Sequence, residues 1–329
     1  MFIFAVEKSK VKGMKVDGLG IRGYLYQTLF LILYNFIPNK DLSPWSLDFQ
    51  PKNIIIMNTK TFITIALFSA CMTGFATGNN ETMPEMATMM ASKKVKPVTV
   101  ERNCSTFTAI ENSTPCNVFY KQGEAIKVSI VAPQEQVDKI NTYVVDGVLK
   151  IEMEDNTFIK ETKNVKINVE SPSIESITLM GSGKITAQDM INTSGKDLSL
   201  SVKGSGVLKM KKLECNEMNV NISGSGNAEF GTLSASSVNV ETNGSGNASL
   251  GGMKINKKLA VVINGSGNTS VSGKADVVNV EIHGSGNVTG KVDCDNVTAT
   301  IKGSGDVKLS GDIKAHYTTV TGSGRVTIK

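Results

Sequence analysis

The chain has 329 residues, a formal net charge of +5, 40% hydrophobic residues and only 6% aromatic residues. This length allows one large domain or two ordinary ones, with a core built from aliphatic side chains. Eight of the 35 Lys and Arg and four of the 30 Asp and Glu precede residue 79, so 27 basic and 26 acidic residues follow it. The clustered positive charge of nucleic-acid-binding proteins is missing, so we expect no nucleic-acid partner.

The first 78 residues differ from the rest of the chain. Met57-Asn-Thr-Lys60 is followed by an apolar run and small residues, TFITIALFSACMTGFATG, which is the pattern of a secretory signal peptide. Signal peptides begin at the N-terminus, so we predict that Met57 is the start and that 1–56 is an upstream extension of the reading frame. The alternative is a real extension whose apolar run YLYQTLFLILYNFI lies at a membrane interface, because that run is too short to span a bilayer.

Segment 57–78 allows two processing routes. Ala76-Thr-Gly78 suits ordinary signal cleavage, whereas Phe68-Ser-Ala-Cys71 is close to a lipoprotein box in which Cys71 carries the lipid. Either route exports the protein, to the periplasm, the outer-membrane surface or the medium, and only lipidation would hold it on a membrane. Residues 79–95 show no hydrophobic period and are predicted to form a flexible linker.

Residues 96–180 contain strand patterns without a repeat. The expected strands are 117–121, 125–131, 142–145, 148–153, 163–170 and 174–180, with Asp146-Gly147 as a hairpin turn. We interpret this region as irregular first coils that also cap the structure that follows, because an uncapped sheet edge recruits other chains. Cys104 and Cys116 lie close together in the sequence, and in an oxidising compartment they would form a disulfide; the alternative is two unpaired small residues.

Gly-Ser-Gly recurs eight times in residues 181–324, at intervals of 23, 20, 20, 21, 19, 19 and 19 residues. Apolar residues recur two and four positions before each first glycine and four and six positions after it, which predicts strands with one buried face. The glycines mark either a pinched coil or a corner with positive φ. These sixteen turn glycines are Gly181, Gly183, Gly204, Gly206, Gly224, Gly226, Gly244, Gly246, Gly265, Gly267, Gly284, Gly286, Gly303, Gly305, Gly322 and Gly324.

A unit of about twenty residues buries too little apolar surface to fold alone, so successive units must stack. We predict an all-β fold, a right-handed parallel β-helix (solenoid) with about 19–21 residues per coil over 181–329, because parallel crossovers are almost always right-handed. A β-propeller with two units per blade is the alternative. An asparagine follows four successive triplets, and in register these side chains would form an amide ladder: Asn227, Asn247, Asn268 and Asn287.

The repeat register also places single residues. Cys215 and Cys294 each lie nine residues before a triplet and are expected to be small buried residues, too far apart to bond to each other. Their inward column otherwise contains Gly195, Ala235, Asn256, Ala275 and Ile313. His283 is expected on an outward surface column, and His316 at a polar end position in the last coil.

Several motifs precede the serial triplets in a fixed order. They are Tyr120-Lys-Gln-Gly123, Asp146-Gly-Val-Leu-Lys-Ile151, Val165-Lys-Ile-Asn-Val169, Ser171-Pro172 and Ile177-Thr-Leu-Met-Gly-Ser-Gly183. Together with the repeats, they resemble the bacterial "putative auto-transporter adhesin head, GIN domain" family over residues 105–329. The resemblance implies a secreted or surface right-handed β-helix in the envelope of a Gram-negative bacterium, and it supplies no catalytic residues.

No motif predicts a cofactor, a metal or a catalytic nucleophile. The eight triplet serines are equivalent and the chain has only two histidines, so a serine nucleophile with its own histidine base is not indicated. Phosphate-binding glycine loops are followed by a helix, whereas strands follow these triplets. A calcium solenoid would need a nine-residue Gly-Gly-x-Gly-x-Asp period, to which only Gly303-Ser-Gly-Asp306 comes close.

The strongest enzyme alternative is a polysaccharide lyase or glycoside hydrolase on the same fold. Such an enzyme needs grouped carboxylates, and the nearest candidates are Glu241 and Glu281, two coils apart with Val262 between them. We therefore expect a non-catalytic surface module, an adhesin or a structural envelope protein. Its expected partner is a glycan or a host or envelope protein, and we also expect self-association through the C-terminal edge.

Overall fold

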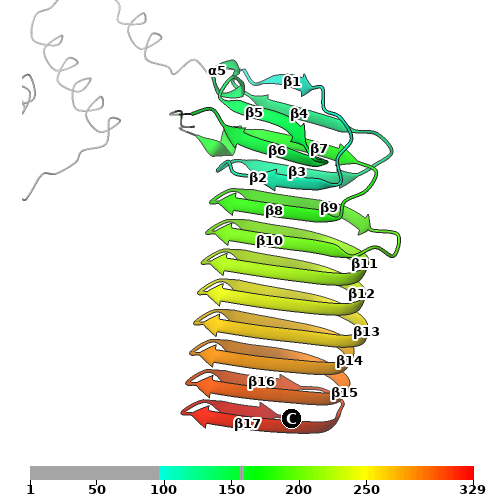
Figure 1. The fold of residues 1–329 in the computed structure, drawn as a ribbon, viewed down its shortest axis with the longest axis vertical. Helices are drawn as coiled ribbons and strands as arrows, with labels where there is room; N and C mark the ends of the chain where they lie inside the picture. The colour runs from blue at the N-terminus through cyan, green and yellow to red at the C-terminus, as the bar shows by residue number, and fades with distance from the viewer. Residues whose placement is uncertain (1–95, 156, 158, 160) are drawn as a thin grey trace, which may run out of the picture. The chain divides into compact units, whose positions relative to one another are not determined.

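The computed structural model describes residues 96–329 except 156, 158 and 160. The upstream extension, the signal segment, Cys71 and the linker 79–95 lie outside the described residues. The described strands form one 18-stranded sheet that winds into a right-handed parallel β-solenoid of about eight turns (Figure 1). This confirms the predicted fold class. No helix among these residues is long and apolar enough to cross a membrane.

Most of the solenoid consists of long strands that each make one full coil. These strands are β11 (Val207–Gly224), β12 (Asn227–Gly244), β13 (Asn247–Gly265), β14 (Asn268–Gly284) and β15 (Asn287–Gly303). The last coil and a half comprises β16 (Asp306–Ser310), β17 (Ile313–Gly322) and β18 (Arg325–Ile328). Each strand pairs in parallel with the coils before and after it, so equivalent positions of the repeat stack in columns.

Each coil is flattened into two faces. We call the segments that follow the triplets the back face; it comprises β9 (Lys184–Asn192), the first halves of β11–β15, β16 and β18. The segments that precede the triplets make the front face, which comprises β8 (Ser176–Gly181), β10 (Leu198–Gly204), the second halves of β11–β15, and β17. The front face is turned toward the viewer in Figure 1.

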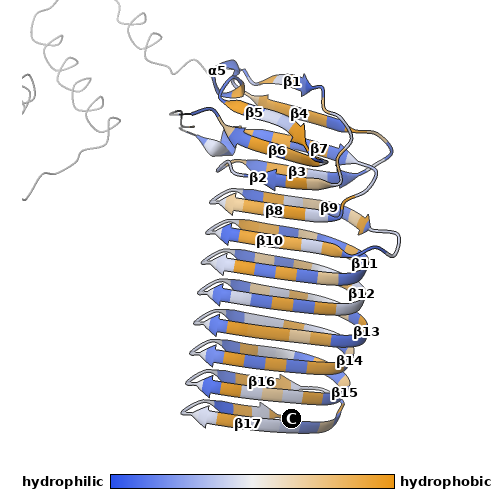
Figure 2. Cartoon of the chain, viewed as in Figure 1, coloured by the Kyte–Doolittle hydropathy of each residue, from blue (hydrophilic) through white to orange (hydrophobic). Residues whose placement is uncertain are grey.

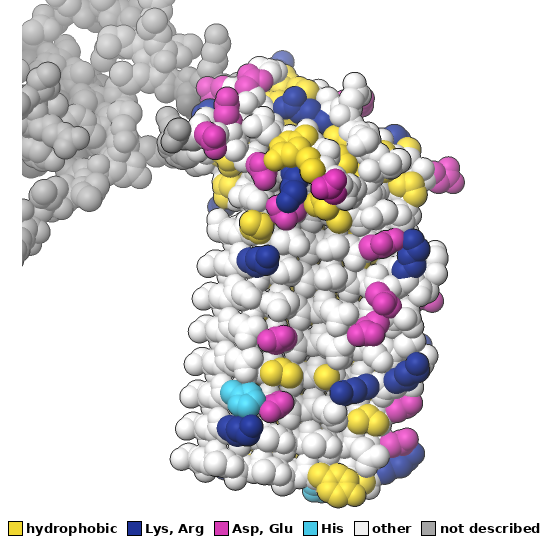
Figure 3. All heavy atoms as spheres, in the orientation of Figure 1, with side chains coloured by type: hydrophobic (Ala, Val, Ile, Leu, Met, Phe, Trp, Pro, Cys, Tyr) yellow, Lys and Arg dark blue, Asp and Glu magenta, His cyan; other side chains and the backbone are white. Residues whose placement is uncertain are grey.

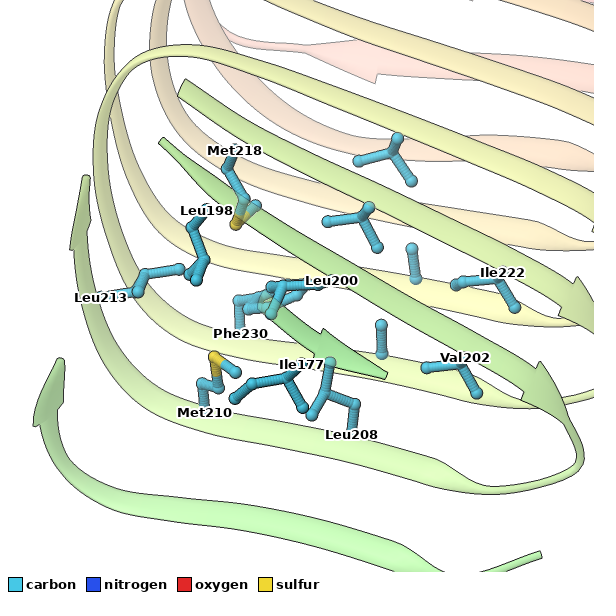
Figure 4. Close-up of a cluster of buried hydrophobic side chains, with 14 of the residues drawn as sticks. Ile177, Leu198, Leu200, Val202, Leu208, Met210, Leu213, Met218, Ile222 and Phe230 are labelled. Carbon is cyan, nitrogen blue, oxygen red and sulfur yellow. The ribbon is translucent and has the colours of Figure 1, made fainter. Parts of the chain in front are cut away.

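The interior between the two faces is aliphatic. Apolar and polar residues alternate along the strands (Figure 2), and the apolar columns point inward. Figure 4 shows Leu200 of the front face beside Phe230 of the back face, and Ile177 of the front face beside Leu208 of the back face. Each of these four side chains is at most 3% exposed. Burial of such side chains contributes roughly 1.5–3 kcal/mol each, and stacking adds the burial that a single coil lacks.

The eight Gly-Ser-Gly triplets stack in register along one narrow edge of the solenoid, where the front-face strands end in Figure 1. The first glycine has φ between +97° and +143° in all eight copies. The second glycine has no positive φ, but a Cβ on Gly246 would lie 2.5 Å from the carbonyl oxygen of Gly226. The two explanations left open by the sequence therefore both apply: the first glycine needs both its positive φ and the close approach of the neighbouring coil, and the second needs only the close approach.

The N-terminal part of the described chain is less regular. Its elements are β1 (Val98–Arg102), β2 (Ala109–Asn112), β3 (Asn117–Gln122), β4 (Lys127–Ala132), α5 (Gln134–Val137), β5 (Ile140–Val145), β6 (Val148–Met153), the 3-10 helix η1 (Thr162–Asn164) and β7 (Lys166–Ser171). Strands β2 and β6 extend the front face in parallel, and β3 and β7 extend the back face. Beyond them, β5 on one side and β4 and β1 on the other run antiparallel to their neighbours.

Most predicted strands in this region match within a few residues. Asp146 and Gly147 form the predicted hairpin turn between β5 and β6, with φ of +50° and +72°. One boundary was wrong: residues 162–164 form a 3-10 helix, and strand β7 begins only at Lys166, next to the buried Val165.

The register corrects two members of the predicted cysteine column. Cys215 and Cys294 are buried, at 7% and 6% exposure, and Ala235 pairs with Cys215 as expected. In the 21-residue coil, however, Ile255 and not Asn256 pairs with Ala235, because the register shifts just after this pair. Gly195 is also outside the column, since it lies in an exposed turn with φ of +80°.

Candidate functional site

An amide ladder runs along the back face. Its members are Asn227, Asn247, Asn268 and Asn287, the first residues of β12–β15. Each lower amide Nδ2 donates to the Oδ1 of the asparagine above, over 2.9, 3.0 and 2.9 Å in order along the solenoid. The ladder ends at Asp306, whose backbone N–H donates to Asn287 Oδ1 over 3.0 Å. These hydrogen bonds fix the amides in one repeating orientation.

A second outward column lies beside the ladder, two residues further along each strand. It begins at Thr186, which is itself only 6% exposed, and passes through Lys209, Glu229, Ser249, Ser270 and Thr289. Lys209 and Glu229 form an ion pair, and Ser270 Oγ donates to Ser249 Oγ over 3.0 Å. The two columns together present closely spaced hydrogen-bonding groups whose charges are balanced.

A shallow hollow of about 630 Å³ lies over these two columns. Asn227, Asn247 and Asn268 line it together with the side chains of Ser249 and Ser270. Gly231 also lines the hollow and adds no side chain to fill it. A Cβ there would lie 2.5 Å from the Lys211 carbonyl oxygen, so the close approach of the coils requires glycine.

A smaller hollow of about 340 Å³ continues the same face toward the N-terminal end. Phe119 of β3 lines it, half-buried and outward between the buried Val118 and Tyr120. Gln188 lines both hollows and lies at a register irregularity between β9 and β11. Bulges of this kind redirect side chains and are common beside binding sites.

The front face carries different outward columns. Asn264 Nδ2 donates to Asn243 Oδ1 over 2.8 Å, and Asn239 Nδ2 donates to Asn219 Oδ1 over 2.9 Å. Figure 3 shows that the solenoid part of this face is largely uncharged between two groups, a short column of charged side chains near the triplet edge and a second group of Lys, Arg, Asp and Glu along the opposite edge. Both hollows described above lie on the back face.

The enzyme candidates Glu241 and Glu281 lie in the predicted column with Val262 between them. Each is engaged by a neighbour: Asn243 Nδ2 donates to Glu241 over 2.9 Å, and Glu281 lies 2.9 Å from His283 Nε2. His283 is on the outward column predicted for it, and His316 is exposed in the last coil opposite Val297. Across the described part of the chain, no three His, Cys, Asp or Glu residues are arranged to hold a metal ion.

The four described cysteines are free thiols, so the disulfide predicted between Cys104 and Cys116 is not present in this structure. Cys116 is buried directly before β3, and its N–H donates to Thr114 Oγ1 over 3.2 Å. Cys104 is half-buried and precedes β2. Burial raises the pKa of all four thiols, that of Cys215 to about 11. At neutral pH these thiols are protonated and poor nucleophiles.

Several residues of the back face were missed by sequence reasoning. Phe119 and Gln188 carry no repeat signal, because they belong to the irregular coils before the second triplet. The interval of 23 residues between the first two triplets did signal extra residues near Gln188. Gly231 and Gly251 occupy the same position in successive repeats, and that recurrence could have identified the close approach.

Comparison with known proteins identifies a family to which this chain is similar. The family model described as "Putative auto-transporter adhesin, head GIN domain" matches residues 106–277 and 259–329. No curated protein matches the chain.

Solved structures show the same architecture. A putative adhesin from Parabacteroides merdae ATCC 43184 is 20% identical with a TM-score of 0.63, covering 72% of this chain and 97% of the other. A putative adhesin from Parabacteroides distasonis ATCC 8503 is 17% identical with a TM-score of 0.64, covering 72% and 98%. A putative lipid binding protein from the same organism is 19% identical with a TM-score of 0.57, covering 72% and 98%. At these identities, the likeness shows the shared fold.

Proposed function

The chain belongs to the putative auto-transporter adhesin head GIN domain family, and from that premise we propose that it is a non-catalytic binding module of the cell surface. The family description supports an adhesin or binding role. The binding surface in this proposal is the back face, centred on the amide ladder. Its partner is a component of another cell or of the envelope, either a glycan or a protein.

The observation that carries the proposal is the hollow over the amide ladder. Binding sites are usually concave, with a few polar groups held in fixed positions. Here the amides of Asn227, Asn247 and Asn268 are held by each other and line a hollow of about 630 Å³. A preformed row of this kind loses little conformational entropy on binding.

The front-face carboxylates support a non-catalytic role. Glu241 and Glu281 are two coils apart, which places them about 10 Å from each other at ~4.8 Å per coil, and Val262 separates them. Retaining and inverting glycosidases need carboxyl groups about 5–9.5 Å apart, so this spacing lies at the upper limit. Neither Glu241 nor Glu281 lines either of the two hollows. Glu241 and Glu281 therefore give no support to a polysaccharide lyase or glycoside hydrolase.

Export belongs to the same proposal. The family suggests a surface or exported protein, and the sequence TFITIALFSACMTGFATG after Met57 has the pattern of a signal peptide. Cleavage after Gly78 would release the protein, whereas lipidation of Cys71 would anchor it. Mass spectrometry of the N-terminal peptide from the native producer distinguishes these routes.

The binding proposal is tested with the full chain on a glycan array and on surface-protein extracts, together with an assay for release of reducing ends. We expect binding without release. The variant Asn247→Ala/Asn268→Ala should weaken binding at the back face. The matched control Asn243→Ala/Asn264→Ala disrupts an amide pair on the front face and should leave binding unchanged. Release of reducing ends from any polysaccharide would contradict the non-catalytic role.

A further inference from the structure

The two hollows of the back face form one track along the solenoid axis. The outward column of the larger hollow continues from Lys209 to Thr186, and Thr186 pairs with Phe119. Phe119 in turn pairs with Asn168 of β7, which lines the smaller hollow. From β7 to β15 the track crosses eight successive strands, so it is about 34 Å long at ~4.8 Å per step. An elongated ligand is needed to fill it.

The polar groups of the track suit hydroxyl groups. A side-chain amide has two N–H donors, and the amide ladder uses one of them in each of Asn247, Asn268 and Asn287. The hydroxyls of Ser249 and Ser270 add groups that both donate and accept. The larger hollow therefore offers donors and acceptors at the spacing of the coils, which a chain of linked sugars can meet repeatedly.

Phe119 gives the track an apolar platform at its N-terminal end. Its ring is outward and half-buried in the smaller hollow, between Asn168 and Thr186. Aromatic side chains supply a large apolar contact surface at low conformational cost, and the C–H face of a sugar ring is a suitable partner. In many interfaces a few aromatic residues contribute most of the binding free energy, and the polar groups around them contribute less. Phe119 would have that role here, beside the row of hydrogen-bonding groups.

The charges along the track favour an uncharged ligand. The larger hollow has Lys211 and the ion pair of Lys209 with Glu229, and the smaller hollow has Lys121 and Lys127 alongside Glu170 and Asp189. Four lysines therefore face three carboxylates, an excess of one positive charge along the whole track. A polyanion binds through unpaired clustered Lys and Arg, and its affinity then falls steeply with salt. A single excess positive charge spread over this length offers little of that attraction.

From these features we propose that the back face binds an extended, neutral polysaccharide whose chain runs along the solenoid axis, from Phe119 to Thr289. The proposal rests on the proposed function and names the ligand class of the same surface. The amide ladder and the neighbouring serines bind the sugar hydroxyls, and Phe119 stacks on one sugar ring. A ligand that spans both hollows gains more contacts with each added residue.

The experiment measures binding of the full chain to soluble polysaccharides by affinity electrophoresis. The neutral probes are dextran, yeast mannan, xyloglucan and arabinoxylan, and the anionic probes are polygalacturonate and heparin. We expect at least one neutral probe to bind, with little change between 50 and 500 mM salt (about a tenfold range). Phe119→Ala should weaken this binding about fivefold or more, as loss of an aromatic anchor does.

Two controls separate binding from folding. Phe119→Tyr retains the ring and should bind like the parent chain, and Asn243→Ala/Asn264→Ala alters only the front face. Circular dichroism melts confirm that each variant is folded. The inference is wrong if no neutral probe binds, if binding falls steeply with salt, or if a folded Phe119→Ala binds like the parent. If the chain then still binds surface proteins or whole cells, the proposed function stands without this ligand class; if it binds none of them, both are wrong.

Discussion

At the scale of single residues, the three positions of the Gly-Ser-Gly triplet have different structural roles. The first glycine supplies a positive φ that other residues adopt only at a cost. The second allows the coil above to approach its Cα, and the serine between them is exposed to solvent. The periodic glycines were predictable from the sequence. The separate roles of the two glycines were not predictable, because a positive φ and a close approach of the backbone both select the same residue type.

These roles predict the effect of alanine at each position of one triplet. Gly244→Ala places a Cβ 2.5 Å from the Gly224 carbonyl oxygen at φ of +132°, and backbone strain alone should lower the free energy of unfolding by about 1–3 kcal/mol. Gly246→Ala should also destabilise, through the collision with the Gly226 carbonyl oxygen. Urea unfolding measures both. Ser245→Ala serves as the control and should change stability by less than about 0.5 kcal/mol.

A single carboxylate predicts part of the pH dependence. The hydrogen bond from Lys308 Nζ, at 2.9 Å, holds the pKa of Asp306 below its usual value, and Arg325 at 3.6 Å acts in the same direction. A lowered folded-state pKa stabilises the folded chain above the unfolded-state pKa, and this contribution is lost as pH falls through the folded-state pKa. Unfolding midpoints of the parent and Asp306→Asn should therefore differ at about pH 6 and converge only once the pH has fallen below the lowered folded-state pKa of Asp306. A constant difference across this range would contradict the assignment.

At the scale of elements, each full-coil strand is held by its neighbours on both sides. The amide ladder adds side-chain bonds to the backbone pairing. Asparagine at four equivalent positions was enough to predict this ladder. The hollow beside it was not predictable, because it depends on the course of the backbone at Gly231 and on the irregular strands β3, β7 and β9. The spacing of residues in the sequence does not show how the backbone bends at these positions.

The ladder predicts a gradient of effects along its length. Asn247→Ala removes the bond to Asn227 and two bonds from Asn268, through its side chain and its backbone N–H. At about 0.5–1.5 kcal/mol for each net hydrogen bond, and less where solvent competes, we expect a loss of about 1–2 kcal/mol in urea unfolding. Asn227→Ala removes one ladder bond and should cost less. An equal or larger cost for Asn227→Ala would show that the ladder contributes little to stability.

At the scale of the described solenoid, the two ends differ. At the N-terminal end, antiparallel strands β1 and β5 close the sheet, and Arg102 Nη2 donates to the carbonyl oxygens of Val137 and Ile140 beside α5. At the other end β17 pairs only with β15 among the described strands. Val320 of β17, on an inward column, is 41% exposed there, and Tyr317 is 69% exposed.

We propose that the edge of β17 pairs with a second copy of the chain, because an open apolar strand edge favours such pairing. Light scattering over a concentration series should show the average mass rising toward that of a dimer. Val320→Lys places a charge at this edge and should return the chain to a monomer. A parent chain that remains monomeric at every concentration would rule out this interface.

The central claim is that Gly-Ser-Gly triplets stack, one per coil, along a single edge. Spin labels on pairs of the exposed triplet serines test it, with accessible native cysteines replaced by serine. Pulsed electron paramagnetic resonance on the pairs Ser225/Ser304 and Ser205/Ser323 should give separations of about 19 and 29 Å, four and six coils at ~4.8 Å each. Separations that do not grow in proportion to the number of coils would contradict the stacked solenoid and the binding face built on it.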